Sequence, residues 1–178
     1  MAWTWFEPLL MNPTERWALV VSLAKSGRFG ADEIAQELER DNTISGQENA
    51  ASALTSRPST EAKAEAWDQA TVQENVPNET HRSICLSFMR FGQEEILAPY
   101  VDRYLEAADD IWDRLGTQKA STALEALFPN PLGSQQLLDK VDAWLEYSPA
   151  NPGAKRYVRE GRDDVARALR AQAKDAQD

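Results

Sequence analysis

The stretch QEEILAPYVDRYLEAADDIWDRL, residues 93–115, decides the fold of this chain. Its apolar side chains recur at intervals of three and four residues, which is the spacing of one face of an α-helix. Pro99 allows either a kink or a new start within this helical stretch. The apolar face consists of Ile96, Leu97, Tyr100, Val101, Tyr104, Leu105, Ala108, Ile111, Trp112 and Leu115. We therefore predict helix over 93–115 with one broad buried face.

Helix signals of the same kind lie on both sides of this stretch. Asparagine precedes proline at residues 12–13, 130–131 and 151–152, and the first and third pairs begin clear helical patterns. An asparagine side chain accepts hydrogen bonds from the free N–H groups of a first turn, and proline fits the next position. The predicted helices cover residues 13–26, 31–40, 47–56, 61–73, 78–89, 117–128, 134–147 and 152–173, with Thr60, Asn78, Thr117 and Ser134 as further caps.

The fold class follows from the helix count. No segment alternates between apolar and polar residues with period two, so we expect no sheet. About nine helices with short loops favour antiparallel pairs, in units of roughly 35 to 45 residues, the scale of HEAT or armadillo-like repeats. We predict an all-α fold of antiparallel helix pairs stacked as a HEAT/armadillo-like superhelical array, with a compact bundle as the alternative. The six tryptophans are scattered singly and are predicted to be core anchors.

The N-terminal segment is predicted to lie outside this array. Trp3, Trp5 and Phe6 belong to an apolar patch that is too short to bury itself, so upstream sequence or a partner is expected to cover it. Residues 1–12 are therefore predicted to be a leader or the remnant of an upstream segment. Residues 13–178 are predicted to be a single α-helical domain.

Composition and charge narrow the class of protein. The hydrophobic content of 42% is too high for a disordered chain. The formal net charge is −10, and the first 150 residues hold 12 basic and 24 acidic side chains. That balance disfavours a nucleic-acid or anionic-membrane surface and leaves a solvated acidic exterior or a weak attraction for basic peptides. The chain has no apolar run long enough to span a membrane, and its single cysteine fits a reducing, cytoplasmic location.

Few residues are available for catalysis. His81 and Cys85 are the chain's only histidine and cysteine, and they lie one helical turn apart. A catalytic zinc needs three protein ligands and an open position, so these two residues cannot hold one. A Cys–His nucleophile pair is the functional interpretation, and a buried thiol beside a structural histidine is the favoured one. The carboxylate pairs Glu94-Glu95 and Asp109-Asp110 are predicted to lie on solvated helix faces, because adjacent helical residues point in different directions.

Two arginines are the candidate binding residues. Five arginines of the last predicted helix have acidic neighbours, and a charge lattice that includes an Asp163–Arg167 pair accounts for them. Arg82 and Arg90 have few acidic residues nearby. We therefore predict that Arg82 and Arg90 contact a peptide carboxylate, which arginine binds through two parallel hydrogen bonds.

Three stretches of the chain carry a resemblance to a known family. They are TEAKAEAW at residues 60–67, GQEEILAPYV at residues 92–101, and EGRDDVARALRAQ at residues 160–172. In this order they resemble the C-terminal helical domain of aminopeptidase N-type zinc metallopeptidases, above all the actinobacterial enzymes. The last domain of those enzymes is similar to that of the endoplasmic-reticulum aminopeptidases. The resemblance extends from about residue 16 to residue 174 and includes no catalytic signature.

The resemblance implies a non-catalytic role. In that family the zinc is bound by an H-E-x-x-H motif and a downstream glutamate on a separate domain, and this sequence lacks the motif. We expect no cofactor in this chain, zinc in the catalytic domain of the parent enzyme, and no activity of the chain alone. The implied role is to cover the active-site chamber and to contact the distal part of a peptide. The implied partners are the catalytic domain of the same polypeptide and peptide substrates, with no nucleic acid and no membrane. The alternative is a free-standing helical-repeat module that binds another protein.

Overall fold

The computed structural model describes residues 11–176, and every regular element in that range is a helix. The α-helices are α1 (Pro13–Lys25), α2 (Ala31–Arg40), α3 (Ile44–Ser56), α4 (Thr60–Thr71), α5 (Asn78–Phe88), α6 (Glu94–Leu97), α7 (Tyr100–Arg114), α8 (Thr117–Ala126), α9 (Gln135–Tyr147) and α10 (Pro152–Asp175), and η1 (Asn130–Leu132) is a 3₁₀ turn. The predicted all-α class is confirmed. The predicted helix over 93–115 is divided at Pro99 into α6 and α7.

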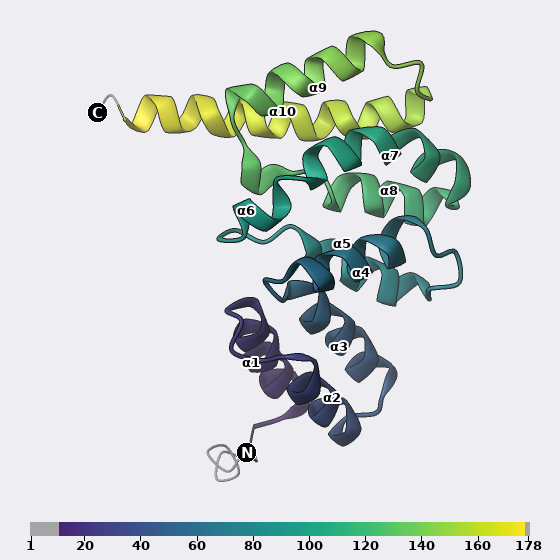
Figure 1. The fold of residues 1–178 in the computed structure, drawn as a ribbon, viewed down its shortest axis with the longest axis vertical. Coiled ribbons are helices and arrows are strands. Elements are labelled where there is room, and N and C mark those ends of the chain that lie inside the picture. The colour runs from purple at the N-terminus through teal and green to yellow at the C-terminus, as the bar shows by residue number, and fades with distance from the viewer. Residues whose placement is uncertain (1–10, 177–178) are drawn as a thin grey trace.

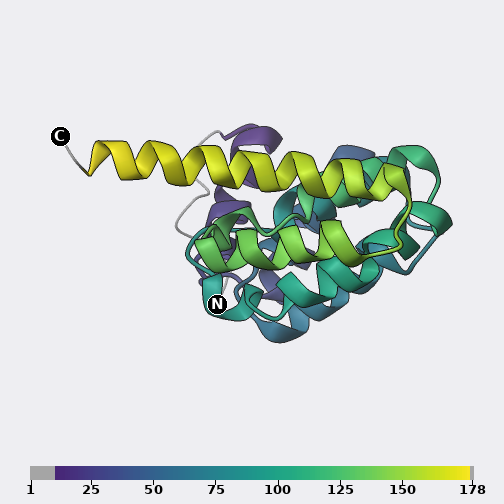
Figure 2. The same ribbon diagram turned by 90° about the horizontal axis from the view of Figure 1, so that it is seen from above.

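The helices form a stacked array of antiparallel pairs. The pairs are α2–α3, α4–α5, α7–α8 and α9–α10, and Figure 1 shows them following one another along the long axis of the molecule. The second helices of the pairs form a row with α1, in which α3 packs between α1 and α5, and α8 packs between α5 and α10. This elongated order confirms the predicted array in preference to a compact bundle. Helix α10 extends well beyond the helices beside it (Figure 2).

The predicted asparagine and serine caps explain where three helices begin. The Asn12 side chain accepts a hydrogen bond from the Glu15 N–H at 3.0 Å, and the Glu15 carboxylate accepts one from the Asn12 N–H. Ser134 accepts from the Leu137 N–H at the start of α9, and Asn151 accepts from the Gly153 N–H at the start of α10. These bonds satisfy N–H groups that the first turn of a helix leaves without partners.

Other predicted helix starts or caps were wrong by one to three residues. Helix α3 begins at Ile44 rather than at residue 47, because the Thr43 hydroxyl accepts from the Gly46 N–H at 3.0 Å. Ser59, not Thr60, caps α4 by accepting from the Ala62 N–H. Asn78 and Thr117 are the first residues of α5 and α8 rather than their caps. In each case the helix start or its cap lies one to three residues earlier than predicted, which is the usual error at helix ends.

The predicted Asp163–Arg167 ion pair was also wrong. Arg167 bonds to Asp164, three residues away, and Asp163 lies 3.5 Å from Arg162. Residues three and four apart are both neighbours on a helix surface, so spacing alone does not select between two adjacent aspartates.

Two hydrophobic cores lie along the array. The N-terminal core is formed by α1, α2 and α3 and consists of Trp17, Val20, Ala24, Ile34, Ala50 and Ala53. The C-terminal core runs from α4 to α10 and contains several aromatic contacts. There the Phe88 and Tyr100 rings meet edge to face at 4.9 Å, and the Tyr104 and Phe128 rings do so at 5.6 Å.

The tryptophans of the described residues pack as predicted. Trp17 is fully buried, and Trp67, Trp112 and Trp144 pack against the C-terminal core. Trp3 and Trp5, with most of the predicted leader, lie outside the described residues. The proposed boundary after residue 12 therefore stays a prediction.

Candidate functional site

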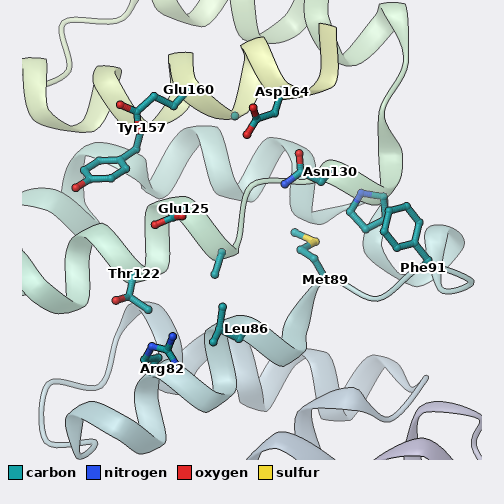
Figure 3. Close-up of a pocket in the computed structure, with 13 residues that line it drawn as sticks. Arg82, Leu86, Met89, Phe91, Thr122, Glu125, Asn130, Tyr157, Glu160 and Asp164 are labelled. Carbon is teal, nitrogen blue, oxygen red and sulfur yellow. The ribbon is translucent and has the colours of Figure 1, made fainter. Parts of the chain in front are cut away.

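A cleft of about 500 Å³ lies across three helices of the row, α5, α8 and α10 (Figure 3). Arg82 and Leu86 enter it from α5, Thr122 and Glu125 from α8, and Tyr157, Glu160 and Asp164 from α10. The connection after α5 and the turn η1 close one end. The lining residues are Arg82, Leu86, Met89, Phe91, Thr122, Glu125, Ala126, Asn130, Pro131, Tyr157, Glu160, Gly161 and Asp164.

A close helix contact supports the wall of the cleft. A Cβ atom on Gly161 would lie 2.4 Å from the Phe128 ring, so α10 reaches this position only because residue 161 has no side chain. Phe128 packs edge to face on Tyr104, whose hydroxyl donates to the Leu124 carbonyl at 2.6 Å. The wall formed by α8 and α10 is thus held by buried groups of the C-terminal core.

The charged side chains of the cleft are mostly acidic. Glu160 accepts a hydrogen bond from Arg156 at 2.8 Å, and Asp164 is paired with Arg167. Glu125 is exposed and has no ion-pair partner among residues 11–176. Arg82 is exposed on the α5 side, opposite the carboxylates of α8 and α10 (Figure 3). The site can therefore hold a cation near α8 and α10 and an anion or carbonyl near α5.

Exposed apolar groups form one lip of the cleft. Phe91 is 69% exposed and Leu86 is 51% exposed, and half-buried Met89 lies between them in sequence. Gly92 has a φ of +85°, and its N–H donates to the Glu94 carboxylate at 2.8 Å, so a tight turn presents Phe91. A positive φ of this size suits glycine. The lip offers an aromatic contact surface that the protein's own core does not use.

The two predicted arginines do not meet in this cleft. Arg82 lines it, whereas Arg90 is half-buried and donates from Nε and Nη2 to the Ser56 hydroxyl at 3.2 and 3.1 Å. Burial lowers the pKa of Arg90 from its ordinary value. The predicted contact of each arginine with a peptide stays a prediction.

Sequence reasoning missed a group of buried polar side chains beside Arg90. Lys63 is fully buried, and its ammonium donates to the Thr55 carbonyl at 2.9 Å and the Phe88 carbonyl at 2.7 Å. Gln93 donates to the Ser56 carbonyl at 2.9 Å. We call the side chains of Lys63, Arg90 and Gln93 the polar joint. It binds the C-terminal ends of α3 and α5, where helix carbonyls lack partners and favour positive charge.

The polar joint also reaches the first helix of the row. Gln93 donates to the carbonyl of Lys25, the last residue of α1, at 3.3 Å. Burial, together with the smaller effect of the nearby Arg90 charge, lowers the pKa of Lys63 to about 7. Within residues 11–176 no carboxylate pairs with Lys63. Two backbone carbonyls hold its amino group, and the Phe88 ring, whose centroid lies 5.2 Å from Nζ, packs against it. The sequence EAKAEAW at residues 61–67 does not indicate that Lys63 is buried, because a lysine between two glutamates resembles a surface residue.

His81 and Cys85 form a structural pair rather than a nucleophilic one. The Nε2–H of His81 donates to the Ala70 carbonyl at 2.8 Å, and the Cys85 sulfur lies 3.7 to 3.8 Å from both ring nitrogens. Burial raises the pKa of the Cys85 thiol to about 12 and lowers the pKa of His81. Both groups are therefore neutral near pH 7, and neither lines the cleft. The favoured structural interpretation fits this geometry.

The predicted carboxylate pairs do not form a metal site within the described residues. Across the described part of the chain, no three His, Cys, Asp or Glu side chains are grouped to hold a metal ion. Glu94, Glu95 and Asp110 are exposed, as predicted, while half-buried Asp109 accepts from the Asn151 N–H at 2.6 Å. No helix of residues 11–176 is both long and apolar enough to cross a membrane.

Comparison with known proteins agrees with this architecture. The model of the ERAP1-like C-terminal domain matches residues 2–167. Aminopeptidase N of Streptomyces lividans is 42% identical over 170 residues, which are 96% of this chain and 20% of that protein. The chain thus spans about a fifth of the length of the curated relative that it matches.

Proposed function

The chain belongs to the family of ERAP1-like C-terminal domains, and on that premise we propose that it covers the active-site chamber of a zinc aminopeptidase and contacts the peptide substrate. The enzyme removes N-terminal amino acids, and its zinc is bound by a separate catalytic domain. This chain contributes binding rather than chemistry. The likeness to an aminopeptidase N supports the proposal, as does a cleft that joins three helices of one row.

One observation carries the peptide-binding part of the proposal. The cleft brings together an exposed arginine, an exposed carboxylate with no ion pair in the described part of the chain, and exposed apolar side chains, on a frame held by a buried core. Peptides offer partners for all three, namely carbonyl or carboxylate oxygens, cationic side chains and apolar side chains. Interactions far from the scissile bond orient a substrate and so contribute to its turnover.

We assign the direct contact to Arg82 and a supporting role to Arg90. Arg82 has no ion-pair partner among the described residues, so binding a peptide oxygen breaks no existing pair. Arg90 is bonded to Ser56 and precedes Phe91, so it fixes the turn that carries the apolar lip. We place the enzyme in the cytoplasm, which the single buried, unpaired cysteine supports.

The test uses the full-length aminopeptidase. Arg82→Ala removes one charge-assisted contact at an exposed site, so we expect KM for a long peptide to rise by about fivefold, roughly 1 kcal/mol. Hydrolysis of a short aminoacyl arylamide is expected to be unchanged, since that substrate does not reach the cleft. Arg159→Ala, an exposed arginine of α10 outside the cleft, is the matched control. Equal effects on both substrates, or none on either, would overturn the proposal.

A further inference from the structure

We infer that the cleft selects peptide segments in which a lysine or arginine lies close to an aromatic or aliphatic side chain. The inference rests on the proposed function only in taking the ligand to be a peptide. It adds a chemical preference to that role, and the preference follows from the charges and exposed groups of the cleft.

The first step is the carboxylate of Glu125, which has no ion pair among the described residues. Glu160 and Asp164 are paired with arginines of their own helix, which reduces their attraction for an outside cation. Glu125 has no such pair within the described range and is exposed on α8. It lies between the acidic wall of α10 and the α5 side of the cleft (Figure 3). Glu125 is therefore the group to which an ammonium or guanidinium of a ligand binds.

The second step is the apolar lip. Phe91 and Leu86 are among the most exposed large apolar side chains of the described residues, and both line this one cleft. Aromatic side chains at binding surfaces contribute most where they are buried by a partner. The Gly92 turn holds Phe91 at the edge rather than over the core. An apolar side chain of the ligand therefore binds here.

The third step is the position of Arg82, the one cationic side chain that lines the cleft among the residues that the structure describes. Arg82 lies on α5, away from the carboxylates of α8 and α10 (Figure 3). Like charges repel, so the basic side chain of a ligand is directed towards Glu125 and away from Arg82. Arg82 is left to bind a carbonyl or carboxylate oxygen of the same segment. An acidic side chain in place of the basic one meets three carboxylates and is disfavoured.

The test measures binding of short labelled peptides to the whole 178-residue chain. Three peptides share one phenylalanine and differ only by lysine, glutamine or glutamate beside it. An exposed ion pair changes affinity modestly, so we expect the lysine peptide to bind about two- to fivefold more tightly than the glutamine peptide. The glutamate peptide is expected to bind least tightly. Added salt is expected to reduce the difference, because it screens exposed charges.

Two pairs of surface variants locate the preference. Glu125→Gln is expected to abolish the advantage of lysine over glutamine, whereas Glu146→Gln, on an exposed site of α9, is expected to keep it. Phe91→Ala is expected to weaken binding of all three peptides. Tyr147 is also highly exposed but lies outside the cleft, so Tyr147→Ala is expected to weaken binding of none. All four side chains are exposed, so none of these changes is expected to unfold the chain.

The outcomes separate the inference from the proposed function. Equal affinity for lysine and glutamine peptides, or a lysine preference that survives Glu125→Gln, overturns the inference and leaves the peptide-binding role standing. Absence of any peptide binding also overturns the inference, while the role of the chain in the enzyme is decided by the Arg82→Ala assay on the full-length protein.

Discussion

The N-terminal and C-terminal cores bury their apolar groups in different ways. Within residues 11–176, Trp17 is the one aromatic residue among the buried members of the N-terminal core, and three of the other five are alanine. The Arg16–Glu37 ion pair at 2.7 Å and the Trp17–Asp41 hydrogen bond at 2.8 Å hold α1 to the helix and loop that follow. The C-terminal core instead has three groups of aromatic contacts, namely Trp67–Phe88–Tyr100, Tyr104–Phe128 and Trp112–Tyr157.

The difference between the two cores indicates which interactions stabilise each core and how the two cores are coupled. Small apolar residues bury little area each, so the N-terminal core depends more on polar bonds than the C-terminal core does. The polar joint lies where the two cores meet, because it binds the ends of α1, α3 and α5 together. We expect it to make the two regions unfold as one unit.

The largest effect is expected from Phe128→Ala. This ring is fully buried, packs on Tyr104 and touches Gly161, so its removal leaves a cavity behind the cleft. Truncation of a buried phenylalanine costs about 3 to 5 kcal/mol. Denaturant unfolding followed by circular dichroism measures the loss. A cost below about 1 kcal/mol would show that the C-terminal core does not depend on its aromatic contacts.

Lys63→Met is expected to cause the next largest loss of stability. It is also expected to let the two cores unfold separately. Methionine fills a similar volume but leaves the buried carbonyls of Thr55 and Phe88 without a donor. Each unsatisfied group costs about 1 to 3 kcal/mol, while removal of a buried charge returns part of that, so we expect a net loss of about 2 to 3 kcal/mol. Unfolding followed at separate probes in the two cores is expected to change from one transition to two.

A second lysine of the same chemistry provides the control. Lys119 donates to the Glu74 and Val76 carbonyls but is only half-buried. Water replaces its hydrogen bonds in Lys119→Met, so we expect a loss below about 1 kcal/mol and a single transition. Equal losses in the two variants would contradict the special role of the polar joint.

The free energy of unfolding measured at several pH values is expected to report the titration of the buried Lys63 amino group. The pKa of Lys63 is lowered from 10.5 to about 7, so between these values the unfolded chain binds a proton that the folded chain lacks. Stability therefore rises with pH across this window, by roughly 2 kcal/mol between about pH 7 and about pH 9. His81 titrates below this range because its pKa is lowered, and the unfolded Cys85 thiol titrates at its upper end.

Lys63→Met is the reference for that series. The variant is expected to lose the rise in stability, and Lys119→Met is expected to keep it. Chemical unfolding at each pH measures both. A rise of the same size in Lys63→Met would assign the effect to other groups.

The sequence predicts those features of the two cores that depend on residues close together along the chain. Helical spacing over 93–115 and the cap at Asn12 identify helices, their buried faces and their pairing, since these depend on neighbours along the chain. The polar joint could not be found in this way. Lys63 and Gln93 donate to backbone carbonyls and Arg90 donates to the Ser56 hydroxyl, with partners up to 68 residues away. The surroundings of these three residues in the sequence are ordinary.

The cleft is hidden from the sequence for the same reason. Its wall depends on Gly161 approaching Phe128, a contact between helices that no spacing rule supplies. Arg82 was identified from its lack of acidic neighbours, whereas Glu125 and Phe91 were not singled out. The one local indication of the apolar lip is a phenylalanine directly before a glycine in FGQEE, residues 91–95.

The smallest effect on stability is expected from loss of a helix cap. The costs of the two cap substitutions are similar, but each is expected to affect a different core. Asn12→Ala removes the cap of α1 in the N-terminal core, and Asn151→Ala removes the cap of α10 in the C-terminal core. Each change costs about 1 kcal/mol, because each leaves one first-turn N–H without its acceptor. In the Lys63→Met background the two cores unfold separately, so Asn12→Ala is expected to shift only the N-terminal transition and Asn151→Ala only the C-terminal one. If both caps shift both transitions there, the cores remain coupled through contacts other than the polar joint.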